Sequence, residues 1–252
     1  MKTTTQPSEQ AEALQNRIVE LSQSLSFDIG LEESLRIAQF VILLHEYNQK
    51  VNLVGTKEIE QIVEKHVLDA LSVAQEVQRL GARRYVDIGC GGGLPGLIVA
   101  LALKDLKVTL VDSIGKKCKF LDEAVAAFNL EKRVEVINGR AEEMGQLKQY
   151  REKFDVGTAR AVGTLMLTME LVVPLLKVQG YFIAQKTHSR IKEEIEESKI
   201  IALALKLMSR QSKTFEIDGL KDNLLVTWQK TGITARTFPR SWKEIQADNK
   251  GL

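Results

Sequence analysis

The sequence predicts an α/β fold with a mostly parallel seven-stranded sheet, an antiparallel edge to that sheet, and a helical extension before it. Residues 1–80 show only the three- and four-residue spacing of apolar side chains that is typical of helices. From Arg83 onward, short β-rich runs alternate with amphipathic helical segments, which indicates a parallel sheet with helices on both faces. Near the end, Asp218-Gly219 separates two candidate strands with no helix between them, which predicts an antiparallel hairpin.

Each predicted element follows from this spacing. Three helices are expected in the extension, at Ala11–Leu25, Leu31–Tyr47 and Ile59–Leu80. The strands are expected at Tyr85–Ile88, Val108–Val111, Val134–Ile137, Phe154–Thr158, Tyr181–Ala184, Thr214–Ile217 and Leu224–Gln229. The helices between them are expected at Leu97–Leu103, Lys116–Phe128, Thr164–Leu176 and Ser189–Met208. We therefore divide the chain into a helical extension (1–80), a sheet domain (81–230) and a polar, partly disordered tail (231–252).

Composition narrows the functional class only slightly. The chain has 252 residues, a net charge of +2 and ordinary hydrophobic content (44%). Its two cysteines, Cys90 and Cys118, form no CxxC pair, so neither a disulfide scaffold nor a zinc site is expected, and no metal is predicted. With no long apolar run and a polar first segment, the sequence favours a cytoplasmic protein that does not enter the membrane, which we expect to be a monomer.

The segment Asp87–Gly96 (DIGCGGGLPG) joins the first strand to its helix and is the strongest functional signal. Glycines such as Gly89 and Gly91 let a backbone turn sharply and approach a ligand closely. The carboxyl end of a strand is where open α/β sheets bind ligands. Because Gly91–Gly96 also matches GxGxxG, a nicotinamide-dependent oxidoreductase is an alternative at this point.

Asp87 favours a different cofactor. Dinucleotide binders place a pyrophosphate at the helix N-terminus, and a carboxylate two residues before Gly89 would repel it. S-adenosylmethionine is a cation without phosphate, so the same acid would favour its binding. Asp112, at the end of the second strand, is placed to accept bonds from ribose hydroxyls, and Ala141 and Glu142, after the third, are placed to read an adenine edge. Together these residues predict a methyltransferase.

The methyl acceptor is indicated partly by missing motifs. The four prolines are never adjacent, so the Pro-Pro-aromatic element that holds an exocyclic amine is absent. Neither cysteine follows a proline, which argues against C5 methylation of a pyrimidine. Guanine N7 fits better, because its lone pair needs no general base and catalysis then depends mainly on alignment.

Basic residues follow four of the predicted strands and would share one rim of the sheet. Such a rim suits RNA phosphates, and an arginine can also pair with guanine O6. Ordinary surface charge is the competing interpretation. The candidates for RNA contact are Lys116, Lys117, Arg140, Arg160 and Lys186.

From about Phe40 to Lys186 the chain resembles the ribosomal RNA small subunit methyltransferase G family, also called glucose-inhibited division protein B. The matching marks are Tyr47-Asn48, Asn52-Leu53, His66-Val67-Leu68-Asp69, Asp87–Gly96, Asp112–Lys117, Arg140-Ala141-Glu142, Ala159-Arg160-Ala161 and Gln185-Lys186. The tail departs from the family pattern, because Ser241-Trp242-Lys243-Glu244 replaces the usual basic finish.

The resemblance implies a Rossmann-like class I methyltransferase that modifies N7 of one guanine in the decoding-centre loop of 16S rRNA, either free or in the small ribosomal subunit. It implies substrate-side roles for Arg140 and Lys186, and cofactor contacts by Gly89, Leu94, Ala141, Glu142 and Arg160. His66 and Asp69 are expected to pack between helices rather than to touch RNA. A small-molecule methyltransferase and a non-catalytic binding module on the same fold stay open as alternatives.

Overall fold

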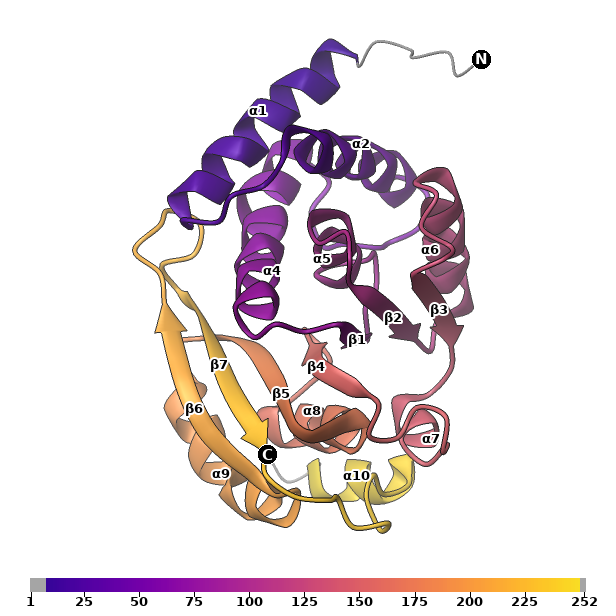
Figure 1. Ribbon diagram of the computed structural model, residues 1–252, viewed down its shortest axis with the longest axis vertical. Helices are drawn as coiled ribbons and strands as arrows, with labels where there is room; N and C mark the ends of the chain where they lie inside the picture. The colour runs from indigo at the N-terminus through magenta and orange to yellow at the C-terminus, as the bar shows by residue number, and fades with distance from the viewer. Residues whose placement is uncertain (1–7, 250–252) are drawn as a thin grey trace.

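The computed structural model describes residues 8–249, and these form a seven-stranded sheet with helices on both faces (Figure 1). The strands are β1 (Arg84–Ile88), β2 (Lys107–Asp112), β3 (Val134–Asn138), β4 (Phe154–Ala159), β5 (Leu176–Thr187), β6 (Leu207–Thr214) and β7 (Asn223–Lys230). Their order is β3-β2-β1-β4-β5-β7-β6. The pairs among β1 to β5 are parallel, and β7 is antiparallel to both β5 and β6. The predicted fold class and its antiparallel edge are confirmed.

Twelve helical elements surround the described sheet. They are α1 (Glu9–Ser24), α2 (Leu31–Asn48), α3 (Ile59–Gln61), the π-helix η1 (Ile62–Val67), α4 (Leu68–Arg79), α5 (Gly96–Ala102), α6 (Gly115–Ala127), α7 (Ala141–Met144), α8 (Leu165–Val172), the 3₁₀ turn η2 (Val173–Leu175), α9 (Ile191–Ala204) and α10 (Trp242–Asn249). The third predicted helix of the extension is thus a continuous helical run with a π segment inside it. Such π segments often occur at functional sites.

Alternation along the strands creates two cores, one on each face of the sheet. In β1, Tyr85 lies in the core shared with α1, α2, α4, α5 and α6, whereas Val86 and Ile88 lie in the core shared with α8, α9 and α10. Asp87 has the same parity as Tyr85 and therefore points to the α5 face. The N-terminal helices α1 and α2 lie at one end of the molecule and α10 at the other, beside α7 and α8 (Figure 1).

Three details of the sequence prediction are corrected. The helix expected over Ser189–Met208 ends at Ala204, and the strand expected at Thr214–Ile217 is instead β6, which ends at Thr214. The sequence of β6, LMSRQSKT, hides this strand because it forms the exposed edge of the sheet and lacks the alternation of a half-buried one. Partial disorder of the tail is wrong over 231–249, where the chain packs on the sheet domain and ends in α10.

The division of the chain at residues 80 and 230 stays a prediction, and residues 1–7 and 250–252 lie outside the described part. Among residues 8–249, no helix is long and apolar enough to span a membrane. Within the same residues, no group of three or more His, Cys, Asp or Glu side chains is placed to hold a metal ion.

Candidate functional site

The glycine loop between β1 and α5 turns in a conformation that favours glycine. Gly89, Gly91 and Gly93 have φ angles of +69°, +55° and +88°. The Gly89 amide donates to the Val111 carbonyl of β2 at 2.8 Å, which fixes the loop across the ends of two strands. A Cβ on Gly89 would lie 2.4 Å from Val162 Cγ2, so no side chain fits there without displacing the chain after β4.

Asp87 is fully buried beneath this loop. Its carboxylate accepts from the Gly96 amide and from the Thr158 hydroxyl, both at 2.8 Å. Burial raises the pKa of Asp87 to about 7, against the effect of these two hydrogen bonds. The carboxylate thus already accepts the hydrogen bond of the amide at the start of α5. In a dinucleotide-binding protein, a pyrophosphate would bind at this position.

This geometry revises the role of Asp87. The sequence argument placed its charge beside a cationic ligand, but Asp87 lines neither of the two cavities at this rim of the sheet. It acts through the loop that it holds. What the structure shows is that the Asp87 carboxylate already accepts the hydrogen bond of the Gly96 amide at the start of α5.

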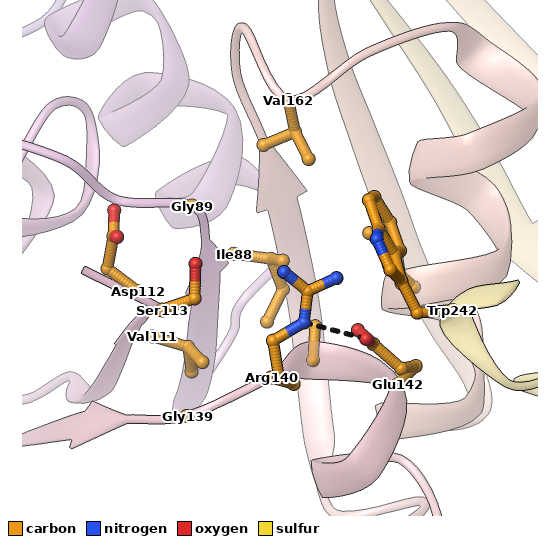
Figure 2. Close-up of a pocket in the computed structure, with 12 residues that line it drawn as sticks. Ile88, Gly89, Val111, Asp112, Ser113, Gly139, Arg140, Glu142, Val162 and Trp242 are labelled. Carbon is orange, nitrogen blue, oxygen red and sulfur yellow. Dashed lines mark hydrogen bonds and ion pairs between the residues drawn. The ribbon is translucent and has the colours of Figure 1, made fainter. Parts of the chain in front are cut away.

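One cavity lies over the carboxyl ends of β1, β2 and β3 (Figure 2). We name it the Trp242 cavity. Its walls are apolar at the back and polar at the mouth, with two carboxylates. The lining residues are Ile88, Gly89, Val111, Asp112, Ser113, Gly139, Arg140, Ala141, Glu142, Val162, Leu171 and Trp242.

Asp112 is preorganised at one wall of the Trp242 cavity. Its carboxylate oxygens accept from the Gly91 amide and the Ile114 amide, each at 2.9 Å. A carboxylate offers about four lone-pair positions, so two further donors can be accepted beside these amides. The placement predicted from the sequence, at the end of the second strand, is therefore compatible with a pair of ribose hydroxyls.

Arg140, Glu142 and Trp242 form the opposite wall. Arg140 Nε donates to Glu142 Oε1 at 2.7 Å, and the guanidinium carbon lies 4.1 Å from the centroid of the Trp242 indole. Figure 2 shows the guanidinium between Asp112 on one side and Trp242 on the other. The arginine predicted for the substrate side therefore lies in the same cavity as the residues predicted for the cofactor.

A second cavity, which we name the His66 cavity, lies on the other side of the glycine loop. Gly89 lines both cavities, so they meet at the first glycine of the loop. The N-terminal extension, the glycine loop, α6 and the end of β4 all contribute to it. Its lining residues are Leu53, Val54, Gly55, His66, Gly89, Cys90, Gly91, Gly92, Leu94, Lys117, Arg160 and Ala161.

Arg160 is held in the His66 cavity by two residues of the N-terminal extension. Its Nε lies 3.3 Å from Asp69 Oδ2, and its Nη2 lies 2.7 Å from His66 Nδ1. Asp69 is buried and also accepts from the Gln185 amide at 2.6 Å. Burial raises the pKa of the Asp69 carboxyl, and the charge of Arg160 opposes this increase.

His66 is held neutral. Burial, followed by the charges of Arg160 and Lys65, lowers the pKa of His66 to about 4. A guanidinium can only donate, so His66 Nδ1 accepts from Arg160 and the neutral ring carries its proton on Nε2. His66 and Asp69 were expected to pack rather than to touch RNA, and both contact Arg160 of the sheet domain; in addition, His66 lines the cavity.

The loop after α2 reaches the same cavity because Asn48 folds it. The buried Asn48 side chain accepts from the Leu53 and Val54 amides at 2.8 and 3.0 Å and donates to the Thr56 carbonyl at 2.8 Å. These bonds join Asn48 to the segment that contains Leu53, two positions of the family motifs noted above.

The basic residues expected around one rim separate into different environments. Lys117 lines the His66 cavity, and Lys116 is exposed at the start of α6. Lys186 is directed elsewhere, because its ammonium lies 2.5 Å from Glu194 of α9 and donates to the Gly163 carbonyl at 3.3 Å. Lys186 lies near the carboxyl end of β5 but lines neither cavity, so Lys117, Arg140 and Arg160 are the basic residues of the predicted rim that line a cavity.

Sequence reasoning noted Trp242 only as part of a departure from the family's tail and did not assign it to a site. The indole belongs to a tail that carried no periodic or motif signal, and only the contact between α10 and the sheet brings it to the cavity. Val162 and Leu53 were also missed as lining residues, although both lie next to or within motifs that the sequence analysis singled out.

Comparison with known proteins places this geometry in a family. A family model described as rRNA small subunit methyltransferase G matches residues 33–221. The chain belongs to this family. Curated members include ribosomal RNA small subunit methyltransferase G of Clostridium perfringens, 40% identical over 86% of this chain and 90% of that protein, and the enzyme of the same name from Caldanaerobacter subterraneus, 38% identical over 91% and 95%.

Solved structures agree on the fold of this family member. An O-methyltransferase from Bacillus cereus in complex with SAH aligns with a TM-score of 0.56 and 17% identity, over 87% of this chain and all (100%) of that one. A caffeoyl-CoA O-methyltransferase, described as putative, from Staphylococcus aureus aligns with a TM-score of 0.52 and 14% identity, over 85% and 98%. At these identities the likeness shows the Rossmann-like class I methyltransferase fold alone.

Proposed function

We propose that this member of the small subunit methyltransferase G family transfers a methyl group from S-adenosylmethionine to N7 of one guanine in the decoding-centre loop of 16S rRNA. The observation that carries the proposal is the junction of two unlike cavities at Gly89. The Trp242 cavity offers carboxylates and apolar walls, and the His66 cavity offers cationic and neutral donors. The names of the relatives supply the class of acceptor, the RNA of the small ribosomal subunit, and guanine N7 follows from the sequence argument.

The residues present fit the cofactor. The strongest sign is Gly89, which lines both cavities and where an added Cβ would lie 2.4 Å from Val162 Cγ2. We infer that Asp112 accepts the ribose hydroxyls and that Ala141 and Glu142 border the adenine. Gly91 and Leu94 would then face the methionine portion from the His66 cavity, close to Arg160. When bound, S-adenosylmethionine supplies a methyl group on a positively charged sulfur.

The chain's contribution to the reaction is alignment. Guanine N7 has a free lone pair, so no residue needs to remove a proton before attack. Keeping His66 neutral avoids one more positive charge beside the sulfonium, while its Nε2–H remains a donor. We infer that Arg160, fixed by Asp69, directs its guanidinium to guanine O6 and leaves N7 open, because a donor on N7 itself would block transfer.

A nicotinamide cofactor is a poorer fit to the same loop. The amide of Gly96 at the start of α5 is already used by the buried Asp87 carboxylate. A pyrophosphate there would have to displace an internal hydrogen bond and approach a carboxylate.

The proposal is tested with purified protein, labelled S-adenosylmethionine and small ribosomal subunits that lack the modification. We expect label in 7-methylguanosine at one position of 16S rRNA, measured by nucleoside mass spectrometry and fragment mapping. Free 16S rRNA, tested in parallel, identifies which form is the acceptor. Label in another base, or efficient transfer to small molecules without RNA, would contradict the proposal.

A further inference from the structure

The segment after β7 is fixed against the sheet domain by polar contacts of two arginines, Arg151 and Arg240. The Arg151 guanidinium donates to the carbonyl oxygens of Thr234, Ala235 and Phe238 at 2.9, 3.0 and 2.7 Å. Further along, Arg240 forms a two-pronged pair with Glu170 of α8, at 2.9 and 2.8 Å. Glu170 is almost completely buried, so this pair holds the segment firmly.

These contacts place α10 at the Trp242 cavity. Ile245 of α10 is buried in the core shared with α8 and α9, and Trp242 begins the helix. The indole is only partly buried and lines the cavity together with Leu171, the neighbour of Glu170. Trp242 lies beyond residues 33–221, so the family model does not account for it.

The position of the indole relative to Asp112 indicates which part of a ligand it meets. Figure 2 shows Asp112 and Trp242 on opposite sides of Arg140. Asp112 marks the ribose side, so the Trp242 side, with Ala141 and Glu142, is the side of the base. Adenine and indole both have flat π surfaces, and base–aromatic contacts are favourable in proteins.

We propose that Trp242 is a binding residue for the adenine base of the cofactor, which is an inference that rests on the proposed function. The Arg140 guanidinium lies over the indole, 4.1 Å from its centroid, and Glu142 accepts a hydrogen bond from its Nε. When the base binds, it packs beside this Trp242–Arg140 pair and against Ala141. In this proposal the tail completes the binding site of the methyl donor and does not contact RNA.

The chain provides its own reporter, because it contains two tryptophans. Trp228 is buried in β7, where its ring stacks on Phe182 at 5.7 Å, and it lines neither cavity. Trp228→Phe therefore leaves Trp242 as the single emitter without changing the cofactor site. Trp242→Phe is the matched control that leaves only Trp228. The probe is S-adenosylhomocysteine, titrated by fluorescence and independently by calorimetry.

Three results are distinguishable. If Trp242 contacts the adenine, the emission of Trp228→Phe should change during the titration, with the same midpoint as the calorimetric binding curve. Trp242→Phe should show no change in emission. Trp242→Ala should bind S-adenosylhomocysteine about fivefold more weakly. Calorimetric binding by the wild-type protein, with unchanged emission of Trp228→Phe and unchanged affinity of Trp242→Ala, would overturn the inference and leave the proposed function intact. No calorimetric binding by the wild-type protein would overturn both.

Discussion

The two cavities that meet at Gly89 are closed by opposite ends of the chain. The His66 cavity, of about 220 Å³, is closed by the loop after α2 and by η1 of the N-terminal extension. The Trp242 cavity, of about 80 Å³, is closed by α10 at the C-terminus. The first set of residues lies within the segment that defines the family, and the second lies outside it.

This difference assigns separate tasks to the flanking segments. His66 and Asp69 of the N-terminal extension orient Arg160, on the side where we place the methyl acceptor. The C-terminal residues form part of the wall of the Trp242 cavity, where we place the adenosyl group. Changes in the extension should therefore affect methyl transfer most strongly, and changes in the tail should affect cofactor affinity most strongly. The predictions below test this division, from the largest expected effect to the smallest.

Asp69→Asn should have the largest effect. It removes a buried charge that orients Arg160, so we expect a loss of about 3 kcal/mol in the free energy of unfolding and at least about a tenfold fall in methyl transfer. Chemical denaturation and the transfer assay measure the two effects, and calorimetry should show S-adenosylhomocysteine affinity nearly unchanged.

Glu76→Ala is the matched control on the same helix. Glu76 is also buried, but its partner Arg79 is 54% exposed and can be solvated when the acid is removed. Transfer per folded molecule should therefore stay at the wild-type level. Equal losses of transfer in both variants would mean that Asp69 contributes only to the stability of α4.

Removing either partner of the ion pair between Arg240 and Glu170 should destabilise the protein, but by different amounts. Arg240→Ala leaves the Glu170 carboxylate buried and unpaired, and we expect it to lower the free energy of unfolding by about 2 kcal/mol. Glu170→Gln should cost less, because the remaining Arg240 is partly exposed and also pairs with Asp248. Both should weaken S-adenosylhomocysteine binding more than they change transfer at saturating cofactor. The reverse order of stabilities would show that this pair does not anchor α10.

Asp87 and His66 predict opposite pH dependences of stability. The pKa of Asp87 rises from 3.8 to about 7 on folding, so the stability it contributes is greatest at low pH and is lost as pH rises toward 7. The pKa of His66 falls from 6.5 to about 4, so its contribution is lost as pH falls from 6.5 toward 4. Relative to wild type, the melting temperature of Asp87→Asn should therefore increase with pH over this range, and that of His66→Gln should decrease. Melting curves between pH 4 and 8 check both signs, and parallel curves for all three proteins would contradict the assignment.

The smallest effect is expected at Lys116. This exposed lysine should contribute about one phosphate contact, so Lys116→Ala should weaken RNA binding about two- to threefold and reduce the slope of log affinity against log salt by about 1. Lys199→Ala is the control, because Lys199 pairs with Glu196 on α9, away from both cavities. RNA binding by filter assay at several salt concentrations separates them, and an equal salt slope in both variants would remove Lys116 from the interface.

The strand–helix alternation and the glycine loop made the fold and the cofactor loop predictable, because both depend on local spacing. Asp112, Ala141 and Glu142 line the Trp242 cavity as their positions led us to expect, because Asp112 ends β2 and the other two lie in the segment after β3. The partners of Asp87, Lys186 and Trp242 were not predictable in this way. The carboxylate of Asp87 turned inward, Lys186 found Glu194 eight residues later, and Trp242 reached the cavity only through the packing of α10. Side-chain direction and tertiary docking decide such cases, and a single sequence contains little information on either.

The account is tested most directly by a crystal structure of the protein with S-adenosylhomocysteine. We predict one molecule spanning the junction at Gly89, with the ribose on Asp112, the adenine beside Trp242 and the amino-acid end in the His66 cavity. An adenine in the His66 cavity, or a ligand that leaves Trp242 untouched, would contradict the division of labour between the two ends of the chain.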